Sequence, residues 1–319
     1  MNVYAGIEIG ATKQQIVLGY MDGSVYQSVC GKVDIAEGAQ GILYWIKTTL
    51  PPLIDEAVNN GHVVCGIGVG FGGVVERATG RVLFSVQVKG WENIALKEWF
   101  EENFKLPAIV ANDTVCGGFC EYLTGSGQGT DVFFYTNIGS GIGGSLFFNG
   151  KDYDGQGYGA AYFGQTYIPD PLGSKTPVKI ENVCSGLAIE HRLRTPGYMP
   201  KDSLLLDICN GKLAALTCRE LKTAAEQGDM FAKEEINMVA KSVGIGLANI
   251  ATLFHPQRMS IGGGVSHLGR LLLDPMEEAA KVMAFSPCST GFDVVLSTHT
   301  ELCVPIGAIL LSAKSEEGV

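Results

Sequence analysis

Charged residues are scarce in this chain, and basic residues form no run. Asp, Glu, Lys and Arg make up 18% of the 319 residues, below the roughly 25% that is usual for a globular protein. Because 46% of the residues are hydrophobic, extended intrinsic disorder is excluded. The net charge is −10, from 23 Lys and Arg against 33 Asp and Glu. Such a chain repels the phosphates of nucleic acids, so we expect no nucleic-acid partner.

Long uninterrupted apolar runs are also missing. The most apolar stretches, 62–75 and 132–148, are broken by glycines and polar residues, and they fall short of the ~20 apolar residues that span a bilayer. The N-terminus lacks a basic segment and carries Glu8 where a signal peptide needs an apolar core. We therefore expect no membrane partner and a cytoplasmic location.

The nine cysteines form no CxxC pair and, being odd in number and scattered from Cys30 to Cys303, suggest no disulfide framework. Cys116 and Cys120 have the spacing of one helix face, but no second His or Cys pair lies nearby to complete a tetrahedral metal site. The favoured interpretation is two small buried residues.

Glycine, in contrast, is abundant, with 43 residues and no collagen period, which indicates many tight turns or close approaches to a ligand. The chain opens with an apolar segment at 3–9, a turn at 10–13 and an alternating segment at 15–20, which together predict a β-hairpin. The pattern recurs in 132–148, around a second glycine turn. Two such hairpins, each at the head of an α/β stretch, indicate a duplicated architecture.

The remaining elements follow from hydrophobic periodicity. The segment 150–179 is rich in Gly, Pro, Tyr and Asp, so we expect a loop that faces the substrate. Pro51 and Pro52 are expected to interrupt the first helix. Strands are predicted at 63–69, 108–110 and 258–261, and helices at 40–59, 94–104, 113–123, 229–254 and 303–312.

Two segments match the G-x-G-x-x-G pattern by letter, one beginning at Gly68 and one at Gly139. A dinucleotide-binding fingerprint requires a helix after the glycines, but strand-like sequence follows both, which disfavours a Rossmann oxidoreductase. The backbone N–H groups of a glycine turn can still cradle a phosphate. The alternative is that these are tight turns without a ligand.

Four motifs occur in a fixed order: GIEIGATK at 6–13, AND at 111–113, TNIGSGIGG at 136–144 and IGGG at 261–264. In this order they resemble the ROK family of sugar kinases and sugar-responsive repressors, which has the actin-like ATPase (ribonuclease H-like) superfold. The resemblance spans nearly the whole chain. It implies a two-domain α/β fold with the active site in an interdomain cleft. We expect a smaller domain of 1–113 plus 301–319 and a larger domain of 114–300.

The resemblance also implies ATP- and Mg²⁺-dependent phosphorylation of a sugar or sugar-like hydroxyl. Phosphoryl transfer needs hydrogen-bond donors around a spreading negative charge, a divalent metal, and a carboxylate that takes the hydroxyl proton. Asp113 would be that catalytic base; from the residues alone, the favoured role is instead to cap the helix that follows it. The implied ATP and phosphate donors are Gly10, Thr12, Lys13, Gly139, Ser140, Gly141, Gly262, Gly263 and Gly264.

The chain departs from the family pattern in three places. Glu8 stands where the family usually has Asp, and its longer carboxylate would hold magnesium directly or through water. The zinc site of the family, one His and three Cys, is absent, since 168–179 contains no Cys and the His position is Gln165. We therefore expect no structural zinc. The sugar motif Gly-Glu-x-Gly-His reads Ala-Tyr-Phe-Gly-Gln at 161–165, and the implied sugar contacts are Gly72, Gln87, Asn112, Tyr162, Gln165 and Glu181.

Two functions of different classes stay open. The first is a sugar kinase with an altered sugar pocket. The second is a catalytically weak or inactive sugar-binding sensor or regulator of the same fold, which Glu8 and the altered pocket would permit. Family repressors carry an N-terminal helix-turn-helix, whereas this chain starts at its first strand, so we expect no DNA binding. The expected partners are a small-molecule sugar and a second copy of the chain in a homo-oligomer (dimer).

Overall fold

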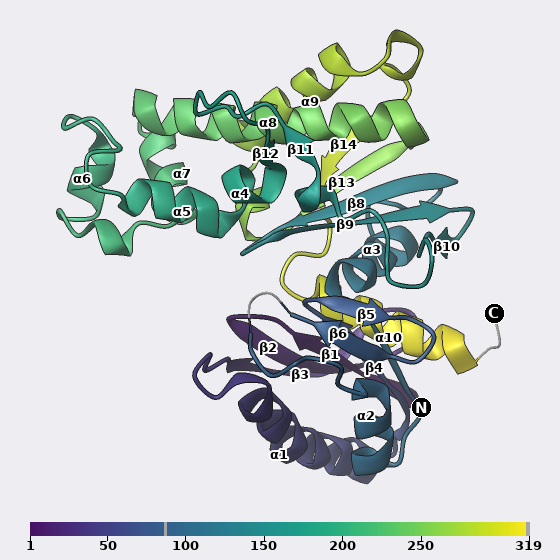
Figure 1. Cartoon of the computed structure of the whole chain (residues 1–319). Helices are drawn as coiled ribbons and strands as arrows, with labels where there is room; N and C mark the ends of the chain where they lie inside the picture. Colours follow the sequence, from purple (N-terminus) through teal and green to yellow (C-terminus); the bar gives the residue numbers. More distant parts are fainter. Residues whose placement is uncertain (86–87, 317–319) are drawn as a thin grey trace. The chain divides into compact units, whose positions relative to one another are not determined.

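The computed structural model describes residues 1–85 and 88–316, which form two compact units (Figure 1). Unit 1 comprises Met1–Gln128, Ser145–Ala161 and the chain from Glu301 onward, and unit 2 comprises Gly129–Gly144 and Tyr162–Thr300. These units differ from the domains expected from the sequence, 1–113 plus 301–319 and 114–300, because 114–128 and 145–161 belong to unit 1. The two segments pack on each other there. The Phe147 ring lies 5.1 Å from that of Phe119 and stacks on Tyr122 at 5.2 Å.

A five-stranded sheet with the order β3-β2-β1-β4-β7 forms the centre of unit 1. The first three strands, β1 (Asn2–Ile9), β2 (Lys13–Gly19) and β3 (Val25–Lys32), are antiparallel neighbours, which confirms the predicted opening hairpin. Strands β4 (Val63–Phe71) and β7 (Ala108–Asn112) run parallel to β1. The carboxyl ends of β1, β4 and β7 therefore meet at one edge of this sheet, where ligands of α/β proteins bind.

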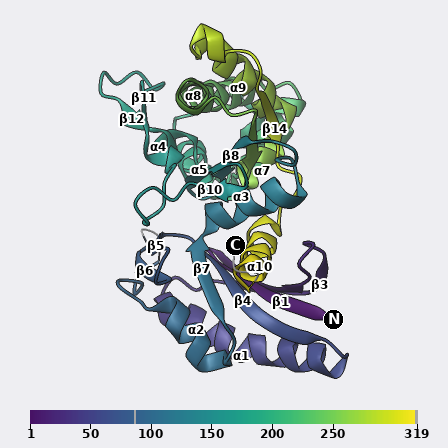
Figure 2. The ribbon, with the colours of Figure 1, turned by 90° about the vertical axis from the view of Figure 1, so that its right-hand side faces the viewer.

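The two faces of this sheet are covered by different helices, as the alternation along β1 requires. Ile7 and Ile9 belong to a core cluster with the buried residues of α1 (Gly38–Asn59), whereas Tyr4 packs with Ile309 of α10 (Cys303–Glu316). At Gly6 a Cβ would overlap the carbonyl oxygen of Pro305, so glycine is what lets α10 contact the strand. Figure 2 shows α1 and α2 (Leu96–Phe104) on the face opposite α10.

Helix α1 runs through Pro51 and Pro52 without a break, so the predicted interruption is wrong. Leu50 and Leu53 on either side of the prolines are buried in the core. This packing holds the helix against the sheet although two backbone N–H donors are missing. The strand-like sequence expected after the first G-x-G-x-x-G segment is β5 (Val74–Glu76). Unit 1 also contains two elements that sequence patterns did not predict, β6 (Arg81–Phe84) and β10 (Lys151–Asp152).

The second sheet has the order β10-β9-β8-β13-β14, and the boundary between the units falls inside β9 (Ile142–Phe148), after Gly144. β8 (Val132–Ile138) pairs in parallel with β13 (Arg258–Gly262), which pairs in parallel with β14 (Asp293–Leu296). The order of neighbours repeats that of the first sheet: three strands consecutive in sequence, then two parallel strands from later in the chain. The predicted duplication is therefore confirmed.

Helices make up most of unit 2, and α8 (Met230–Phe254) lies beside α9 (Arg270–Met283) (Figure 1). By length and composition α8 could cross a membrane, but 61% of its most apolar window is buried inside the protein, as in the core helix of a globular unit. The segment expected to be a loop carries a short hairpin, β11 (Tyr167–Ile168) with β12 (Val178–Lys179). The other helices are α4 (Ile180–Cys184), α5 (Gly186–Arg194), α6 (Leu204–Ile208) and α7 (Cys218–Glu226), and 3₁₀ turns occur at Phe163–Gln165, Leu213–Ala215, Gly264–Leu268 and Ser286–Cys288.

Candidate active site

In unit 1, predicted site residues come from the carboxyl ends of three parallel strands. Glu8 lies beside Gly70 in the β1–β4 register, and Phe71 lies beside Asn112 in the β4–β7 register. Gly72, the next residue after β4, donates its N–H to the Ile9 carbonyl at 2.9 Å. A Cβ at Gly72 would lie 3.5 Å from Oδ2 of Asp113, so the backbone there passes close to this carboxylate.

Asp113 is the first residue of α3 (Asp113–Thr124), and the N-cap position belongs to Asn112. The Asn112 side chain accepts the Thr114 N–H at 2.9 Å and donates to the Gly73 carbonyl at 3.0 Å. Asp113 Oδ1 also accepts the Thr114 N–H, at 2.8 Å, while Oδ2 accepts no hydrogen bond from another residue of the described chain. Capping by Asn112 thus leaves one oxygen of Asp113 for a different partner.

The pKa of Asp113 is raised from its ordinary value of 3.8 to about 6. Burial of the carboxyl group is the main cause and the negative charge of Glu8 is the second, while the hydrogen bonds from Thr114 act in the opposite direction. A carboxyl with this pKa is ionised at neutral pH yet basic enough to accept a proton from a hydroxyl group in a transition state. This combination is typical of a general base.

The first glycine turn is closed by a hydrogen bond from the Gly10 N–H to the Lys13 carbonyl at 3.2 Å. Thr12 accepts the Val33 N–H at 3.1 Å through its carbonyl, and the residue is exposed. The Lys13 ammonium lies 3.6 Å from Glu8 Oε2 and 3.3 Å from Glu301 Oε2. Lys13, expected to be a phosphate donor, is thus held between two carboxylates.

Gln15 is a site residue that the sequence analysis missed. It stands opposite Glu8 in the β1–β2 register, and its amide donates to Glu8 Oε2 at 2.6 Å and to the Glu301 carbonyl at 2.9 Å. Burial raises the pKa of Glu8, and Lys13 and Gln15 partly offset that rise. The hairpin register could have identified Gln15, because the two residues face each other across the turn; the contact with Glu301 has no signal in the local sequence.

The Glu8 carboxylate fits a magnesium ion that is also held by phosphate oxygens. Magnesium is usually bound by one or two carboxylates together with substrate phosphates and water. Glu8 Oε1 lacks a hydrogen bond from any other described residue, so this oxygen is available to the metal. Within 1–85 and 88–316, no group of three or more His, Cys, Asp or Glu could hold a metal by itself.

Unit 2 brings together the second glycine turn and the Gly262–Gly264 motif. The Gly139 N–H donates to the Gly141 carbonyl at 2.9 Å, which closes a tight turn around Ser140. Gly263 has φ +85°, and a Cβ there would overlap Asn137 Oδ1, so glycine is required at this position. Gly262 is buried against Tyr135, whereas Gly263 and the turn at 139–141 are half-buried and Gly264 is exposed. This accessible backbone is suited to contact with a phosphate or a nucleotide.

The predicted sugar residues of unit 2 lie around Glu181, in the first turn of α4. Its Oε2 accepts the Ile142 N–H at 2.8 Å, and its Oε1 accepts the Gln165 amide at 3.0 Å. Gln165 in turn accepts the Lys179 ammonium at 2.8 Å through its Oε1. Tyr162 is half-buried and precedes the 3₁₀ turn that contains Gln165. Both ends of the Gln165 amide are therefore engaged within the protein.

Each unit gathers one part of the expected site. Gln87 lies outside the described residues. Unit 1 contains Glu8, Gly10, Thr12, Lys13, Gly72, Asn112 and Asp113, and unit 2 contains Gly139, Ser140, Gly141, Tyr162, Gln165, Glu181, Gly262, Gly263 and Gly264.

Comparison with known proteins agrees with this set of motifs. The ROK family model matches residues 4–315. The chain belongs to the ROK family. This ROK protein has the two-domain, mixed α/β actin-like fold of the family's sugar kinases, as its likeness to a solved glucokinase indicates. That structure, from Streptomyces griseus in complex with glucose and AMPPNP, has a TM-score of 0.85 at 27% identity and covers 98% of this chain and 99% of its own.

Relatives of this ROK protein include both enzymes and regulators. A glucokinase of Halalkalibacterium halodurans is 28% identical over 303 residues, which cover 92% of this chain and 90% of the relative. A xylose repressor of Caldicellulosiruptor bescii is 24% identical over 309 residues, which cover 96% of this chain and 77% of the repressor. The relatives therefore include a sugar kinase, which supports sugar phosphorylation, and a repressor, which is a regulator.

Proposed function

We propose that this ROK protein phosphorylates a hydroxyl group of a sugar or sugar-like molecule with ATP, and that Asp113 accepts the hydroxyl proton. The observation that carries the proposal is the Asp113 carboxylate itself. Its Oδ2 has no other described residue as hydrogen-bond partner, and its pKa is raised to about 6. The glucokinase relatives support the same activity.

In the proposed reaction the substrate hydroxyl donates its proton to Asp113 Oδ2 as its oxygen forms a bond to the γ-phosphorus of ATP. The bond from that phosphorus to the bridging β–γ oxygen breaks, and ADP leaves with its electron pair. Gly72 leaves space beside Oδ2 because it has no side chain, and Asn112 fixes the backbone at the start of α3. Bound ATP would supply the phosphoryl group, and magnesium would neutralise charge on its phosphate oxygens. Glu8 would hold the metal. In the turns that follow β1 and β8, the Gly10 and Gly139 N–H groups close the turns, and the other backbone N–H groups there would bind phosphate oxygens. Since ATP is the donor, we also propose that the protein acts in the cytoplasm.

We further propose that the sugar pocket discriminates against glucose and N-acetylated hexosamines. Tyr162 offers a ring that can stack on an apolar sugar face, where the family's Glu could only accept hydrogen bonds. The amide of Gln165 is already engaged by Lys179 and Glu181. A substrate hydroxyl left without its usual partner costs ~1–3 kcal/mol, so two changed contacts would lower kcat/KM about 10²–10⁴-fold.

A coupled assay of ATP consumption over a panel of sugars and polyols tests the activity and the specificity together. We expect one or more members of the panel to be phosphorylated with a much higher kcat/KM than glucose, N-acetylglucosamine or N-acetylmannosamine. The Tyr162→Glu/Gln165→His variant is expected to gain activity on the latter three. Efficient turnover of glucose by the parent protein, or a folded and ATP-binding double variant that gains nothing, would refute the specificity proposal.

A catalytically weak sugar sensor is the second candidate. The contacts of Lys13 favour it, because an ammonium held by Glu8 and Glu301 is already partly neutralised and attracts a phosphate less strongly than a free ammonium would. The repressor relative is consistent with this function. Calorimetric binding of a sugar with micromolar affinity, without ATP consumption over the same panel, would favour the sensor over the kinase.

A further inference from the structure

Three polar side chains and one backbone amide of unit 2 form a hydrogen-bonded chain with a defined direction. Lys179 Nζ donates to Gln165 Oε1 at 2.8 Å, Gln165 Nε2 donates to Glu181 Oε1 at 3.0 Å, and the Ile142 N–H donates to Glu181 Oε2 at 2.8 Å. An ammonium can only donate, so Lys179 fixes which end of the Gln165 amide it meets. The NH₂ end of Gln165 then faces Glu181, whose carboxylate can only accept a hydrogen bond.

The far end of this chain lies directly behind the second glycine turn. Ile142 follows Gly141 in sequence, and its N–H is held by Glu181. At the other end of the turn, the Gly139 carbonyl accepts the Gly186 N–H at 2.8 Å. A Cβ at Gly186 would lie 3.0 Å from that carbonyl oxygen, so glycine permits the close contact. The short segment 181–186 therefore holds both ends of the turn.

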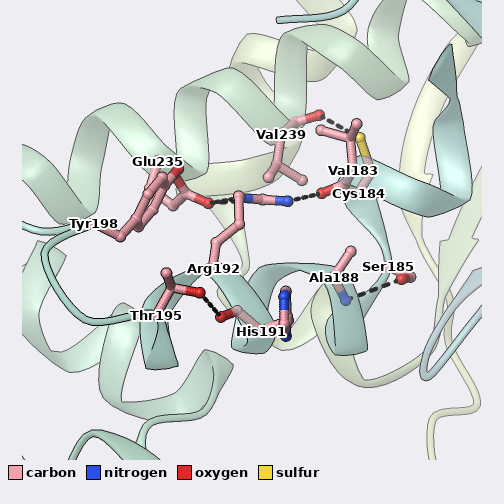
Figure 3. A network of polar contacts seen from close by, with 10 residues as sticks. All are labelled: Val183, Cys184, Ser185, Ala188, His191, Arg192, Thr195, Tyr198, Glu235 and Val239. Atoms are coloured by element: carbon pink, nitrogen blue, oxygen red, sulfur yellow. Dashed lines mark hydrogen bonds and ion pairs between the residues drawn. The ribbon is translucent and has the colours of Figure 1, made fainter. Parts of the chain in front are cut away.

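The same segment is also held at Val183 by a buried ion pair (Figure 3). The Arg192 guanidinium donates to the Val183 carbonyl at 2.6 Å and, through two nitrogens, to Glu235 Oε1 at 2.8 and 2.6 Å. Tyr198 donates to the other oxygen of Glu235 at 2.7 Å. Because Arg192 and Glu235 are both buried, α4 is held firmly against α8.

We propose that Lys179 is a positioning residue for the nucleotide side of the site. Through Gln165 it orients Glu181, and Glu181 fixes the amide that ends the glycine turn. The inference rests on the proposed function in one respect, namely that the Gly139–Gly141 turn binds phosphate. Glu181 is also one of the sugar contacts that the family resemblance implies, so sugar binding there would be linked to phosphate binding at the turn through one carboxylate.

The test compares Lys179→Met with Lys179→Arg, which retains a cationic donor, and with Lys175→Met. Lys175 is exposed in the same loop, and none of the described residues forms an ion pair or hydrogen bond with its side chain, so it controls for loss of charge. The first readout is the ¹⁵N–¹H signal and hydrogen exchange of the Ile142 amide in the ligand-free protein. We expect a shifted and faster-exchanging Ile142 amide in Lys179→Met, and an unchanged one in the other two variants.

The second readout is the Kd for AMPPNP with magnesium, measured by calorimetry without sugar. A net hydrogen bond corresponds to about a 2- to 10-fold change in affinity. We expect weakening of this size in Lys179→Met and parent-like binding in Lys179→Arg and Lys175→Met. An unchanged Ile142 amide in Lys179→Met overturns the inference, as does unchanged AMPPNP binding by that variant. Failure of the parent itself to bind AMPPNP would instead refute the proposed function, and the Ile142 amide would still decide whether Lys179 positions the turn.

Discussion

Replacing Asp113 with Asn should strongly slow phosphoryl transfer and stabilise the protein in the same variant. The substitution keeps the size of the side chain and an oxygen that can accept the Thr114 N–H, but it removes the basic oxygen and the negative charge. Loss of a general base lowers the rate about 10²–10⁴-fold. Binding of AMPPNP should be nearly unchanged, since Asp113 is proposed to take a proton and not to hold the nucleotide.

The gain in stability follows from the direction of the pKa shift. The pKa of Asp113 rises from 3.8 to about 6 on folding, so the ionised carboxylate is less favourable in the folded state than in the unfolded one. A difference of about two pH units corresponds to about 3 kcal/mol at ~1.4 kcal/mol per unit. The side chain is only half-buried, and solvent screening reduces the expected gain to about 1–2 kcal/mol.

The pH dependence separates this effect from a general change in packing. Stability that the neutral carboxyl contributes is fully present below pH 3.8 and is lost as the pH rises through about 6. The difference in unfolding free energy between variant and parent should therefore be close to zero near pH 4 and largest above pH 7. Over the same range, kcat/KM of the parent should rise with pH, with a midpoint near 6.

Urea denaturation at several pH values and steady-state kinetics on the best substrate of the panel provide the measurements. The exposed Asp55 in α1 offers a matched control, because Asp55→Asn removes one negative charge far from any predicted site residue in the sequence. We expect that variant to keep parent activity and a stability difference that does not grow with pH. Near-normal turnover by Asp113→Asn would refute the assignment of the base, and lower stability of that variant at pH 7.5 would refute the electrostatic reasoning.

Three further predictions concern other parts of the molecule. In Glu8→Gln, kcat/KM should begin to fall at a lower pH than in the parent, because the Glu8 charge helps to raise the pKa of Asp113. An unchanged pH dependence in the variant would contradict this effect of Glu8 on Asp113. Arg192→Met should cost about 3–5 kcal/mol in urea denaturation by leaving Glu235 charged and buried, whereas Arg192→Met/Glu235→Leu should cost much less than the sum of its single variants. Elemental analysis of protein purified without added metal should find no stoichiometric zinc, and chelation should leave the melting temperature unchanged; one zinc per chain would show that a ligand set was missed.

The sequence predicted the elements whose signals are local. Alternating apolar residues around a glycine turn define a hairpin within about twenty residues, and both hairpins are present. Helix α9 and strand β14 were not predicted, although both lie in a segment with apolar residues. Their assignment depends on packing, since α9 lies along α8 and β14 completes a sheet that begins at β8. Pro51 and Pro52 were given too much weight, because the buried face of α1 overrides a local helix breaker.

Contacts between distant residues account for most of what sequence reasoning missed. Gln15 meets the Glu301 carbonyl across 286 positions of the chain, and no local pattern indicates that contact. The assignment of 114–128 to unit 1 likewise depends on the rings of Phe119 and Phe147. Gln165 was expected to contact sugar because of its place in a motif. The β11–β12 pairing, with Tyr167 opposite Lys179, instead brings an ammonium to its amide.

Asn112 and Asp113 have different roles, and the structure shows which of the two caps helix α3. An acidic residue after a strand and before a helix is typical both of a helix cap and of a catalytic base, and the sequence cannot distinguish them. The backbone decides, because the extended conformation of Asn112 makes it the residue that precedes the first helical turn. Its amide caps the helix and also binds the Gly73 carbonyl, which a carboxylate could not do without a donor. Asp113 is then free to keep an unpaired oxygen beside Gly72, in surroundings that raise its pKa. The order of the two residues is therefore chemically meaningful. The exchanged variant, Asn112→Asp/Asp113→Asn, would still have a capped helix, but its carboxylate would lie where the Thr114 N–H already satisfies it, and no base would remain at the edge of the sheet.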